Sequence, residues 1–261
     1  MTDLVYVSER KLYGRLGLKP PSSQQGVQGA IKLPPVIEVS GTRSWDRSTT
    51  GLAPHAVVEK AKRLIDRERT VADFTDRGLR SNQWIHFDLD LAQVAVHEDS
   101  GAPPEDVALF VGNVPAGVRG QDREMGVLLC GSVQHVRTRS IPAGRMGSDT
   151  TWLHDLILEV ERREEEGINV IPENITDILA FCPDEYRVEA AAYGVHGWAA
   201  RGYPPRIRGR MSGHAIVLMD IDGPDWTHRL LVATPLYVET HPPAAPSSWV
   251  ARLFGRGREA P

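Results

Sequence analysis

Segments with strand character come in adjacent blocks along this chain, and this grouping constrains the fold more than any other feature. β-Branched and aromatic residues between Gly- and Pro-rich breakers predict strands. The predicted strands cover residues 4–7, 36–39, 83–96, 107–111, 126–130, 215–220 and 229–238. Because helices are inserted between blocks of strands rather than alternating with them, we predict an α+β fold. Its sheet is expected to be mixed and largely antiparallel, with two or three packed helices.

Helices are predicted from apolar spacing and capping signals. Residues 54–69 carry apolar side chains at helical spacing, namely Val57, Val58, Ala61, Leu64 and Ile65. A second helix is predicted over residues 149–166, and a third over residues 171–192, where Pro183 must start or interrupt it. Residues 14–35 are rich in Gly, Pro, Ser and Gln and are expected to be an ordered excursion or a mobile flap. Residues 112–120 are expected to break the strand before them.

Composition sets limits on partners and location. The chain has 261 residues, 41% of them hydrophobic, which is enough for a packed core. With 34 acidic against 30 basic residues the net charge is only -4, so no nucleic-acid partner is expected. Two cysteines, Cys130 and Cys182, without a secretory start indicate reduced thiols and a cytoplasmic location. No apolar run approaches the roughly 20 residues that span a bilayer.

The organisation predicted is a single α+β domain over residues 1–240, followed by a Pro-rich linker and a basic amphipathic tail over residues 241–261. Trp249, Leu253 and Phe254 lie among arginines in this tail. It could make peripheral contact with an anionic membrane or bind a partner protein. Alternatively, it folds back on its own domain or is disordered.

One strand end is a candidate site. The apolar run before Cys130 stops at Gly131 and places Ser132 and His135 at the edge of a sheet, where a loop gives access. A Ser–His or Cys–His pair within hydrogen-bond reach would be a nucleophile with its base. The alternative is a packed strand end whose polar groups are satisfied by the protein.

A second candidate comes from the period of two in residues 84–91. Alternation sends His86, Asp88 and Asp90 to one face of the strand, where a His and two carboxylates would suit a divalent metal ion. The alternative is a half-buried antiparallel strand with a solvated outer face. No other cofactor is indicated.

A third candidate is a row of arginines. Arg206, Arg208 and Arg210 alternate and would project together to bind a phosphate or carboxylate. If this segment lies beside the aspartate strand, however, the charges form cross-strand pairs and need no ligand.

Three motifs resemble one family. They are Tyr-Val-Ser-x-x-Lys at residues 6–11, Gly-Ser-x-x-His at 131–135 and Pro-Leu-Tyr-Val at 235–238. Together they resemble a family of uncharacterised, mostly actinobacterial cytoplasmic proteins grouped as a domain of unknown function. The resemblance covers most of residues 3–240 and implies that the three motifs share one domain. It supplies no activity or catalytic residues.

Function is therefore inferred from the residues. The chain lacks the phosphate-binding Gly-x-x-x-x-Gly-Lys-Ser/Thr loop, the Gly-x-Gly-x-x-Gly fingerprint, His-Glu-x-x-His and Gly-x-Ser-x-Gly. We expect a bacterial cytoplasmic ligand-binding, regulatory or interaction module that recognises a small molecule or a protein. Its candidate binding residues are Tyr6, Ser8, Lys11, Ser132 and His135. The alternative is a hydrolase or transferase that uses Ser132 or Cys130 with His135, or a metal at His86, Asp88 and Asp90.

Overall fold

The fold is known from a computed structural model that describes part of the chain. The described residues are 2–18, 54–97, 107–138, 143–145, 156–157, 159–160, 162–163, 166–168, 185–203, 208–222 and 228–241. Their strands are β1 (Asp3–Val7), β2 (Val71–Asp73), β3 (Trp84–His97), β4 (Val107–Val114), β5 (Met125–Ser132), β6 (Ala143–Arg145), β7 (Gly209–Ile221) and β8 (Arg229–Thr240). Their helices are α1 (Glu9–Leu16), α2 (Pro54–Glu68), the 3₁₀ helix η1 (Val133–His135) and α4 (Glu185–Gly202).

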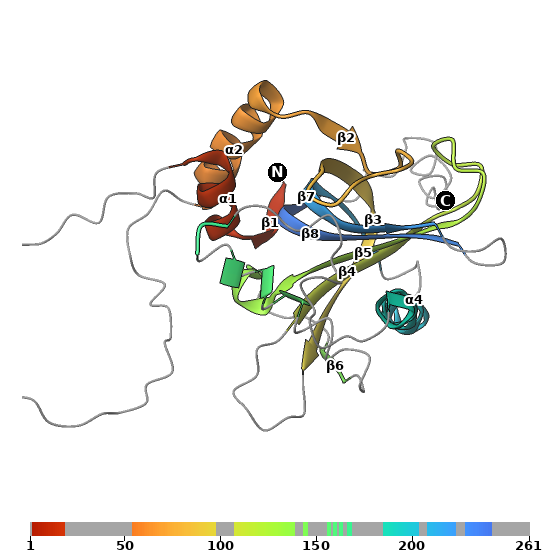
Figure 1. Ribbon diagram of the computed structural model, residues 1–261. Coiled ribbons are helices and arrows are strands. Elements are labelled where there is room, and N and C mark those ends of the chain that lie inside the picture. Colours follow the sequence, from red (N-terminus) through yellow and green to blue (C-terminus); the bar gives the residue numbers. More distant parts are fainter. Residues whose placement is uncertain are drawn as a thin grey trace, which may run out of the picture.

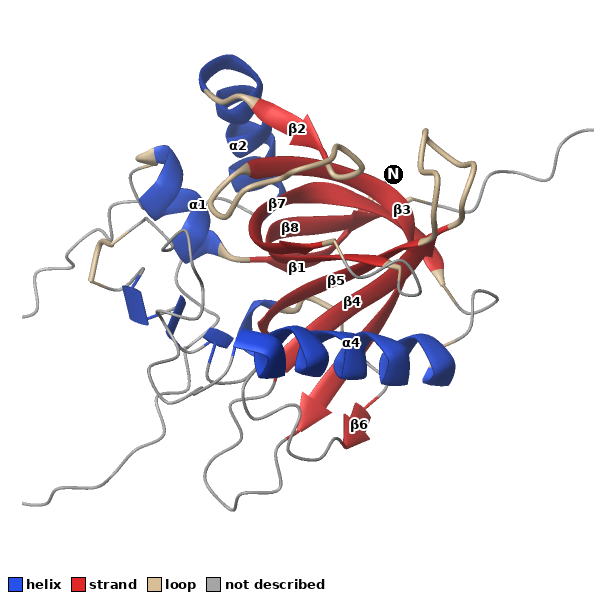
Figure 2. Cartoon of the chain, turned by 45° about the vertical axis from the view of Figure 1, so that its right-hand side comes forward, coloured by secondary structure: helices blue, strands red, loops and turns tan. Residues whose placement is uncertain are grey.

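The central strands close into a ring. β3 pairs with β7 along its first half and with β4 along its second half. β4 then pairs with β5, β5 with β8, and β8 with β7. In the described part of the chain these five strands form a closed barrel, visible as the curved sheet in Figure 2. The predicted α+β class with a mixed, largely antiparallel sheet is confirmed: among the described strands, β2–β3, β3–β6 and β5–β8 pair in parallel and the other pairs are antiparallel.

The barrel interior is filled by apolar side chains. In β3 the alternation sends Ile85, Phe87, Leu89 and Leu91 inward, as the sequence pattern predicts. They meet inward-facing residues of the other strands, among them Phe110 of β4. Full burial of each such side chain contributes roughly 1.5–3 kcal/mol of stability. The interior is therefore a packed core and not a ligand cavity.

Helices cover the outside of the barrel and build a second apolar cluster. α1 and α2 pack together near β1 and β8 (Figure 1), while α4 crosses β4 and β5 at a separate place (Figure 2). From α2 the residues Val57, Val58, Ala61 and Ile65 are buried in this outer cluster. The predicted helix over residues 54–69 is confirmed by α2. None of the helices in the described ranges is long and apolar enough to cross a membrane.

The segments that carry the family resemblance lie on neighbouring strands. β8 pairs with β1 through its last residues and with β5 through its first residues. An isolated bridge between Tyr6 and Val136 then links β1 to the chain that follows β5. The three motifs therefore meet on one side of the barrel.

Several predicted boundaries are wrong. Residues 14–16 belong to α1, not to an excursion, because Leu12 and Leu16 bury an apolar face against the barrel. Gly112 lies within β4 and does not break it, because the glycine fits closely against the carbonyl of Asp90 on β3. Of the helix predicted over 171–192, residues 185–192 belong to α4, which extends to Gly202.

Other predictions fall outside the described residues. The strand over 36–39, most of the excursion over 14–35, residues 171–184, Cys182 and the tail over 242–261 are among them. For the helix over 149–166, helical structure is described only at residues 156–157, 159–160 and 162–163.

Candidate binding pocket

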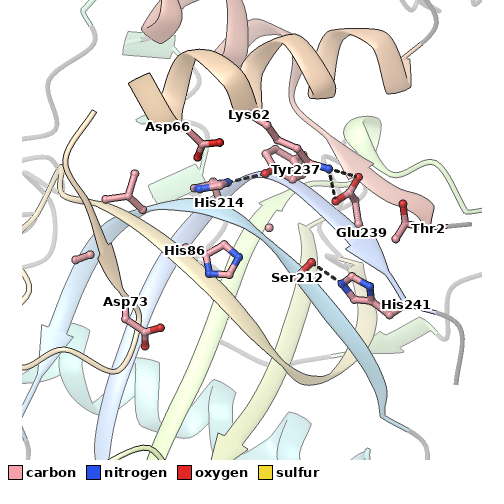
Figure 3. Close-up of a pocket in the computed structure, with 13 residues that line it drawn as sticks. Thr2, Lys62, Asp66, Asp73, His86, Ser212, His214, Tyr237, Glu239 and His241 are labelled. Carbon is pink, nitrogen blue, oxygen red and sulfur yellow. Dashed lines mark hydrogen bonds and ion pairs between the residues drawn. The ribbon is translucent and has the colours of Figure 1, made fainter. Parts of the chain in front are cut away.

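A cavity of about 570 Å³ lies on the outer face of the barrel beneath α2 (Figure 3). Its walls come from α2, β2, β3, β7 and β8, together with residues just outside β1 and β8. The lining residues are Thr2, Lys62, Asp66, Val71, Ala72, Asp73, His86, Ser212, Gly213, His214, Tyr237, Glu239 and His241. Most of these side chains are polar, which separates the cavity from the apolar barrel interior.

Strand register places the polar side chains in rows. His86 of β3 lies opposite His214 of β7, which lies opposite Tyr237 of β8. One step along the same face, Ser212 of β7 lies opposite Glu239 of β8. Because side chains two residues apart share one face of a strand, both rows face α2.

Gly213 allows β7 and β8 to pair closely between these rows. A Cβ atom at this position would overlap the backbone carbonyl oxygen of Tyr237 and press on the ring of Phe87. Glycine is therefore required for the close approach of the two strands at the floor of the cavity.

His214 and Tyr237 form a short hydrogen bond within the first row. The Nδ1 atom of His214 and the hydroxyl of Tyr237 are 2.5 Å apart. Burial, with smaller effects of His86 and Lys62, lowers the pKa of His214 to about 4. Burial, together with the charge of Glu239, raises the pKa of Tyr237 well above its usual range. Both groups are therefore uncharged at neutral pH.

The tautomer of His214 follows from its partner. Among the described residues, the Tyr237 hydroxyl has Nδ1 of His214 as its hydrogen-bond acceptor. We assign the phenolic proton to the bond with Nδ1, because the reverse direction would leave the hydroxyl hydrogen without an acceptor among the described residues; the neutral ring then carries its own hydrogen on Nε2. No described residue is hydrogen-bonded to this Nε2, so it is available to a molecule in the cavity.

Lys62 fixes α2 over the floor of the cavity. Its ammonium group lies 2.9 Å from the carboxylate of Glu239 and 2.8 Å from that of Glu59, and 5.7 Å from the ring centroid of Tyr237. Burial alone would lower the pKa of Lys62, but the hydrogen bonds to Glu59 and Glu239 outweigh it and raise this pKa. The lysine stays charged and connects helix to sheet.

Two further histidines line the cavity. The ring of His86 is exposed, and its centroid lies 5.2 Å from that of His214. His241 follows β8, and its Nε2 atom lies 2.7 Å from Oγ of Ser212. A hydrogen bond from the backbone N–H of His241 to the carbonyl of Arg210 holds this residue beside β7. A serine hydroxyl, an imidazole partner and two other imidazoles therefore face one space.

The charge of the lining is negative. Asp66, Asp73 and Glu239 are acidic, and Lys62 is the basic residue among the lining groups other than histidine. Thr75 donates hydrogen bonds to Asp73, with its N–H at 2.9 Å and its hydroxyl at 2.5 Å. Asp66 is exposed on α2. Electrostatics therefore favours a neutral or positively charged occupant over an anion.

The structure divides the first predicted site. Tyr6 lies inside the barrel, with its ring centroid 5.8 Å from that of Phe110 and 5.7 Å from that of His135. Ser8, at the start of α1, and Lys11, within α1, are buried instead, each only 1% exposed. The ammonium of Lys11 donates to Oγ1 of Thr234 at 2.6 Å. Tyr6 and His135 are brought together, but Ser8 and Lys11 are not part of the same surface.

The strand end of β5 has structural contacts. The hydroxyl of Ser132 caps η1 by accepting a hydrogen bond from the N–H of Gln134 at 3.3 Å. The thiol of Cys130 is directed to the carbonyl of Ala233 at 3.6 Å, and burial raises the pKa of Cys130 to about 12. Neither the Ser132 hydroxyl nor the Cys130 thiol has a hydrogen bond to His135 among the described contacts. None of these residues lines the 570 Å³ cavity.

The predicted metal ligands share a face but do not converge. His86 lines the cavity, whereas the carboxylate of Asp88 is paired with Arg210 at 2.7 Å and with Arg119 at 3.6 Å. Asp90 lies further along β3, opposite Arg210. Within the described ranges, no group of three or more His, Cys, Asp or Glu residues could hold a metal ion. A metal at His86, Asp88 and Asp90 stays a prediction from sequence.

The arginine row lies beside the aspartate strand. Arg210 pairs across strands with Asp88, as in the alternative that needs no ligand. Arg208 is turned elsewhere and donates to the carbonyl of Tyr203 and to Oδ1 of Asn113, both at 3.2 Å. Arg206 lies outside the described residues.

The pocket residues on β7 and β8 were missed from the sequence. Ser212 and His214 alternate on β7, and Tyr237, Glu239 and His241 alternate at the end of β8. The strands predicted over residues 215–220 and 229–238 are shorter than β7, which begins at Gly209, and β8, which ends at Thr240. Extending both by a few residues would have placed the two polar rows opposite each other.

Comparisons of the chain with protein-family models, curated proteins and solved structures found no match. Function must therefore be argued from the cavity and its side chains.

Proposed function

We propose that this protein is a ligand-binding module whose 570 Å³ cavity takes a polar small molecule that is neutral or positively charged. The observation that carries this proposal is the convergence of hydrogen-bonding side chains from separate elements on one space of ligand size. Binding sites combine such a volume with a few oriented polar groups, and here the strands of the barrel hold those groups rigidly.

The polar groups offer defined contacts. In the tautomer assigned from the bond with Tyr237, Nε2 of His214 is a hydrogen-bond donor. His86 offers an exposed ring that can accept a hydrogen bond or stack on a ligand. Asp66 at the rim supplies a negative charge. A ligand that carries an amine or hydroxyl group beside an apolar part would match these features.

The setting proposed is the bacterial cytoplasm, where an unpaired, buried thiol such as that of Cys130 stays reduced. A regulatory role fits a binding module of this kind, since occupancy of the cavity would bear on the contact between α2 and β8. The hydrolase or transferase alternative based on Ser132 or Cys130 has less support, because their side chains are engaged in a helix cap and a buried backbone contact.

Three probes of similar shape test the proposed ligand class: benzylamine, benzyl alcohol and benzoate. Each is titrated into the full chain with ¹⁵N-labelled histidines, and imidazole resonances are followed by NMR. We expect benzylamine and benzyl alcohol to shift the His86 and His214 signals at lower concentrations than benzoate. The charge preference follows from the acidic lining.

A matched pair of variants controls this titration. Asp66→Asn removes a charge at the cavity rim and should weaken benzylamine binding while leaving benzyl alcohol unaffected. Asp90→Asn removes a charge from the outer face of β3, the face that carries His86, but outside the cavity lining. It should change the binding of neither benzylamine nor benzyl alcohol. Preferential binding of benzoate, or shifts confined to histidines outside the cavity, would contradict the proposal.

A further inference from the structure

We propose that Ser212 and His241 form a nucleophilic dyad that cleaves esters of small neutral or positively charged molecules in this cavity. This activity requires the cavity to be the ligand site proposed above. It adds a chemical step to binding and assigns each side chain a role.

The geometry of the dyad is that of a nucleophile and its base. Oγ of Ser212 and Nε2 of His241 are 2.7 Å apart, within the range in which imidazole can take a hydroxyl proton. Ser212 is held by strand pairing on both sides, opposite Asp88 of β3 and Glu239 of β8. Both Ser212 and His241 line the cavity, so the hydroxyl is reachable by a bound ligand.

His214 supplies a donor for the developing oxyanion. It lies two residues from Ser212 on the same face of β7 and lines the same cavity. Its Nε2–H is oriented by the hydrogen bond between Nδ1 and Tyr237. A buried, neutral imidazole can donate to a carbonyl oxygen that gains negative charge, and needs no proton from solvent to do so. This donor takes the place of backbone N–H groups, which on β7 are engaged in pairing with β3 and β8.

The reaction proceeds in two balanced steps. In the first, Oγ of Ser212 forms a bond to the ester carbonyl carbon while Nε2 of His241 takes the hydroxyl proton. The carbonyl oxygen becomes an oxyanion that accepts a hydrogen bond from His214. Collapse of this intermediate breaks the ester C–O bond, and the departing alkoxide takes the proton from His241. In the second, water attacks the acyl-Ser212 with the same proton transfers, which releases the acid and restores the serine.

The substrate class follows from the charge of the lining. Asp66, Asp73 and Glu239 outnumber Lys62, and Lys62 is already engaged by Glu59 and Glu239. A carboxylate or phosphate on the substrate would find no unengaged lysine or arginine in the lining. Esters whose acyl or alcohol part is neutral or cationic are therefore favoured.

Ser132, which also lies near a histidine in the sequence, serves as an internal comparison. Ser132 lies three residues before His135, but its hydroxyl accepts a hydrogen bond from the N–H of Gln134 and caps η1. Sequence proximity thus gives no dyad at Ser132, whereas strand pairing brings together Ser212 and His241, which are 29 residues apart.

The experiment is covalent labelling of the full chain with a fluorophosphonate probe, read by intact mass and peptide mapping. We expect one adduct, on Ser212, which is absent in Ser212→Ala and unchanged in Ser132→Ala. In His241→Gln the labelling rate should fall at least about tenfold, because general-base assistance contributes about 10²–10⁴ in rate. Hydrolysis of acetylthiocholine, a cationic ester, should be lost in the same two dyad variants.

Each outcome is decisive when read beside benzylamine binding. If benzylamine still binds in the cavity but Ser212 is not labelled, the dyad is structural and the inference fails while the binding function stands. Labelling of Ser212 at the same rate in His241→Gln would overturn the role of His241 as base. If neither binding nor labelling occurs in the folded protein, both the binding function and the dyad are wrong.

Discussion

Replacing Arg229 with Met should destabilise the protein strongly, because it breaks a buried ion pair at one end of the barrel. The guanidinium of Arg229 binds Asp220 in a bidentate manner, with Nε at 2.7 Å and Nη2 at 2.9 Å from the two carboxylate oxygens. It also donates to the carbonyls of Thr75, at 3.0 Å, and Asp76. The N–H of Leu79 donates to Asp220 at 3.0 Å. Arg229 thus joins β8 and β7 to the loop after β2.

The magnitude follows from burial. The side chains of Arg229 and Asp220 are only 9% and 6% exposed, so methionine would leave Asp220 as a buried charge with one remaining described donor. Removing one partner of such a pair costs about 3–5 kcal/mol. The double variant Arg229→Met with Asp220→Asn removes the stranded charge, and we expect it to be more stable than Arg229→Met alone.

The loss of stability is measured by urea unfolding, followed by tryptophan fluorescence. It is read as a lower urea concentration at the unfolding midpoint, with the dependence of the unfolding free energy on urea unchanged. The matched control is Arg77→Met, because the ion pair between Arg77 and Asp122 has the same chemistry but side chains 67% and 63% exposed. An exposed pair contributes little to stability, because solvent screens its charges. Equal losses for Arg229→Met and Arg77→Met, within about 1 kcal/mol, would refute the reasoning from burial.

Two further predictions concern Gly131 on β5 and His196 on α4. Gly131→Ala would place a Cβ atom on the phenol of Tyr6 and should lower the free energy of unfolding in urea by about 1–3 kcal/mol. Gly197→Ala in α4 is the control: its Cβ atom meets no neighbouring atom, so it should be neutral or stabilising by up to about 1 kcal/mol. Burial, with the nearby charges of His228 and Arg208, lowers the pKa of His196 to about 4 despite a hydrogen bond to Gly112. In the unfolded chain this histidine is protonated as pH falls below about 6.5, whereas in the folded chain it stays neutral down to about pH 4. Up to about 3 kcal/mol of folding stability is therefore lost as pH falls from about 6.5 to about 4. His196→Gln should reduce this acid-induced loss of stability, measured by urea titrations at pH 7 and 4.5. Replacement of the exposed His55 should not reduce it. Equal acid sensitivity of the two variants would contradict the role of His196.

Much of the barrel could be predicted from sequence because its strands carry local signals. The alternation of Ile85, Phe87 and Leu89 with polar residues fixes which side of β3 faces inward, and this matches the structure. By contrast, the ring closure depends on β3 changing partner from β7 to β4 midway along its length. Such a change of partner arises from twist and long-range pairing, which leave no pattern within the strand itself.

The candidate site was predicted less well because it depends on register between distant segments. Ser132 and His135 are neighbours in sequence, and local structure directs the serine to a helix cap. Ser212 and His241 become neighbours only when β7 pairs with β8 over its full length, including the two register shifts between them. A polar residue at a strand end is thus a weak signal by itself, and its meaning depends on the residue that pairing places beside it.

The cavity lies outside the barrel because α2 carries an apolar row of side chains and, beside it, a charged row. Ala61 and Ile65 form one row along the helix and are fully buried against the sheet. Lys62 and Asp66 form the next row and face the cavity, with Lys62 bonded to Glu239 on the floor. Because the barrel interior is filled by core side chains, this cavity lies outside it, between the sheet and the helix. The apolar row fixes the height of α2 above the strands, so the same helix stabilises the fold and forms the roof of the proposed site.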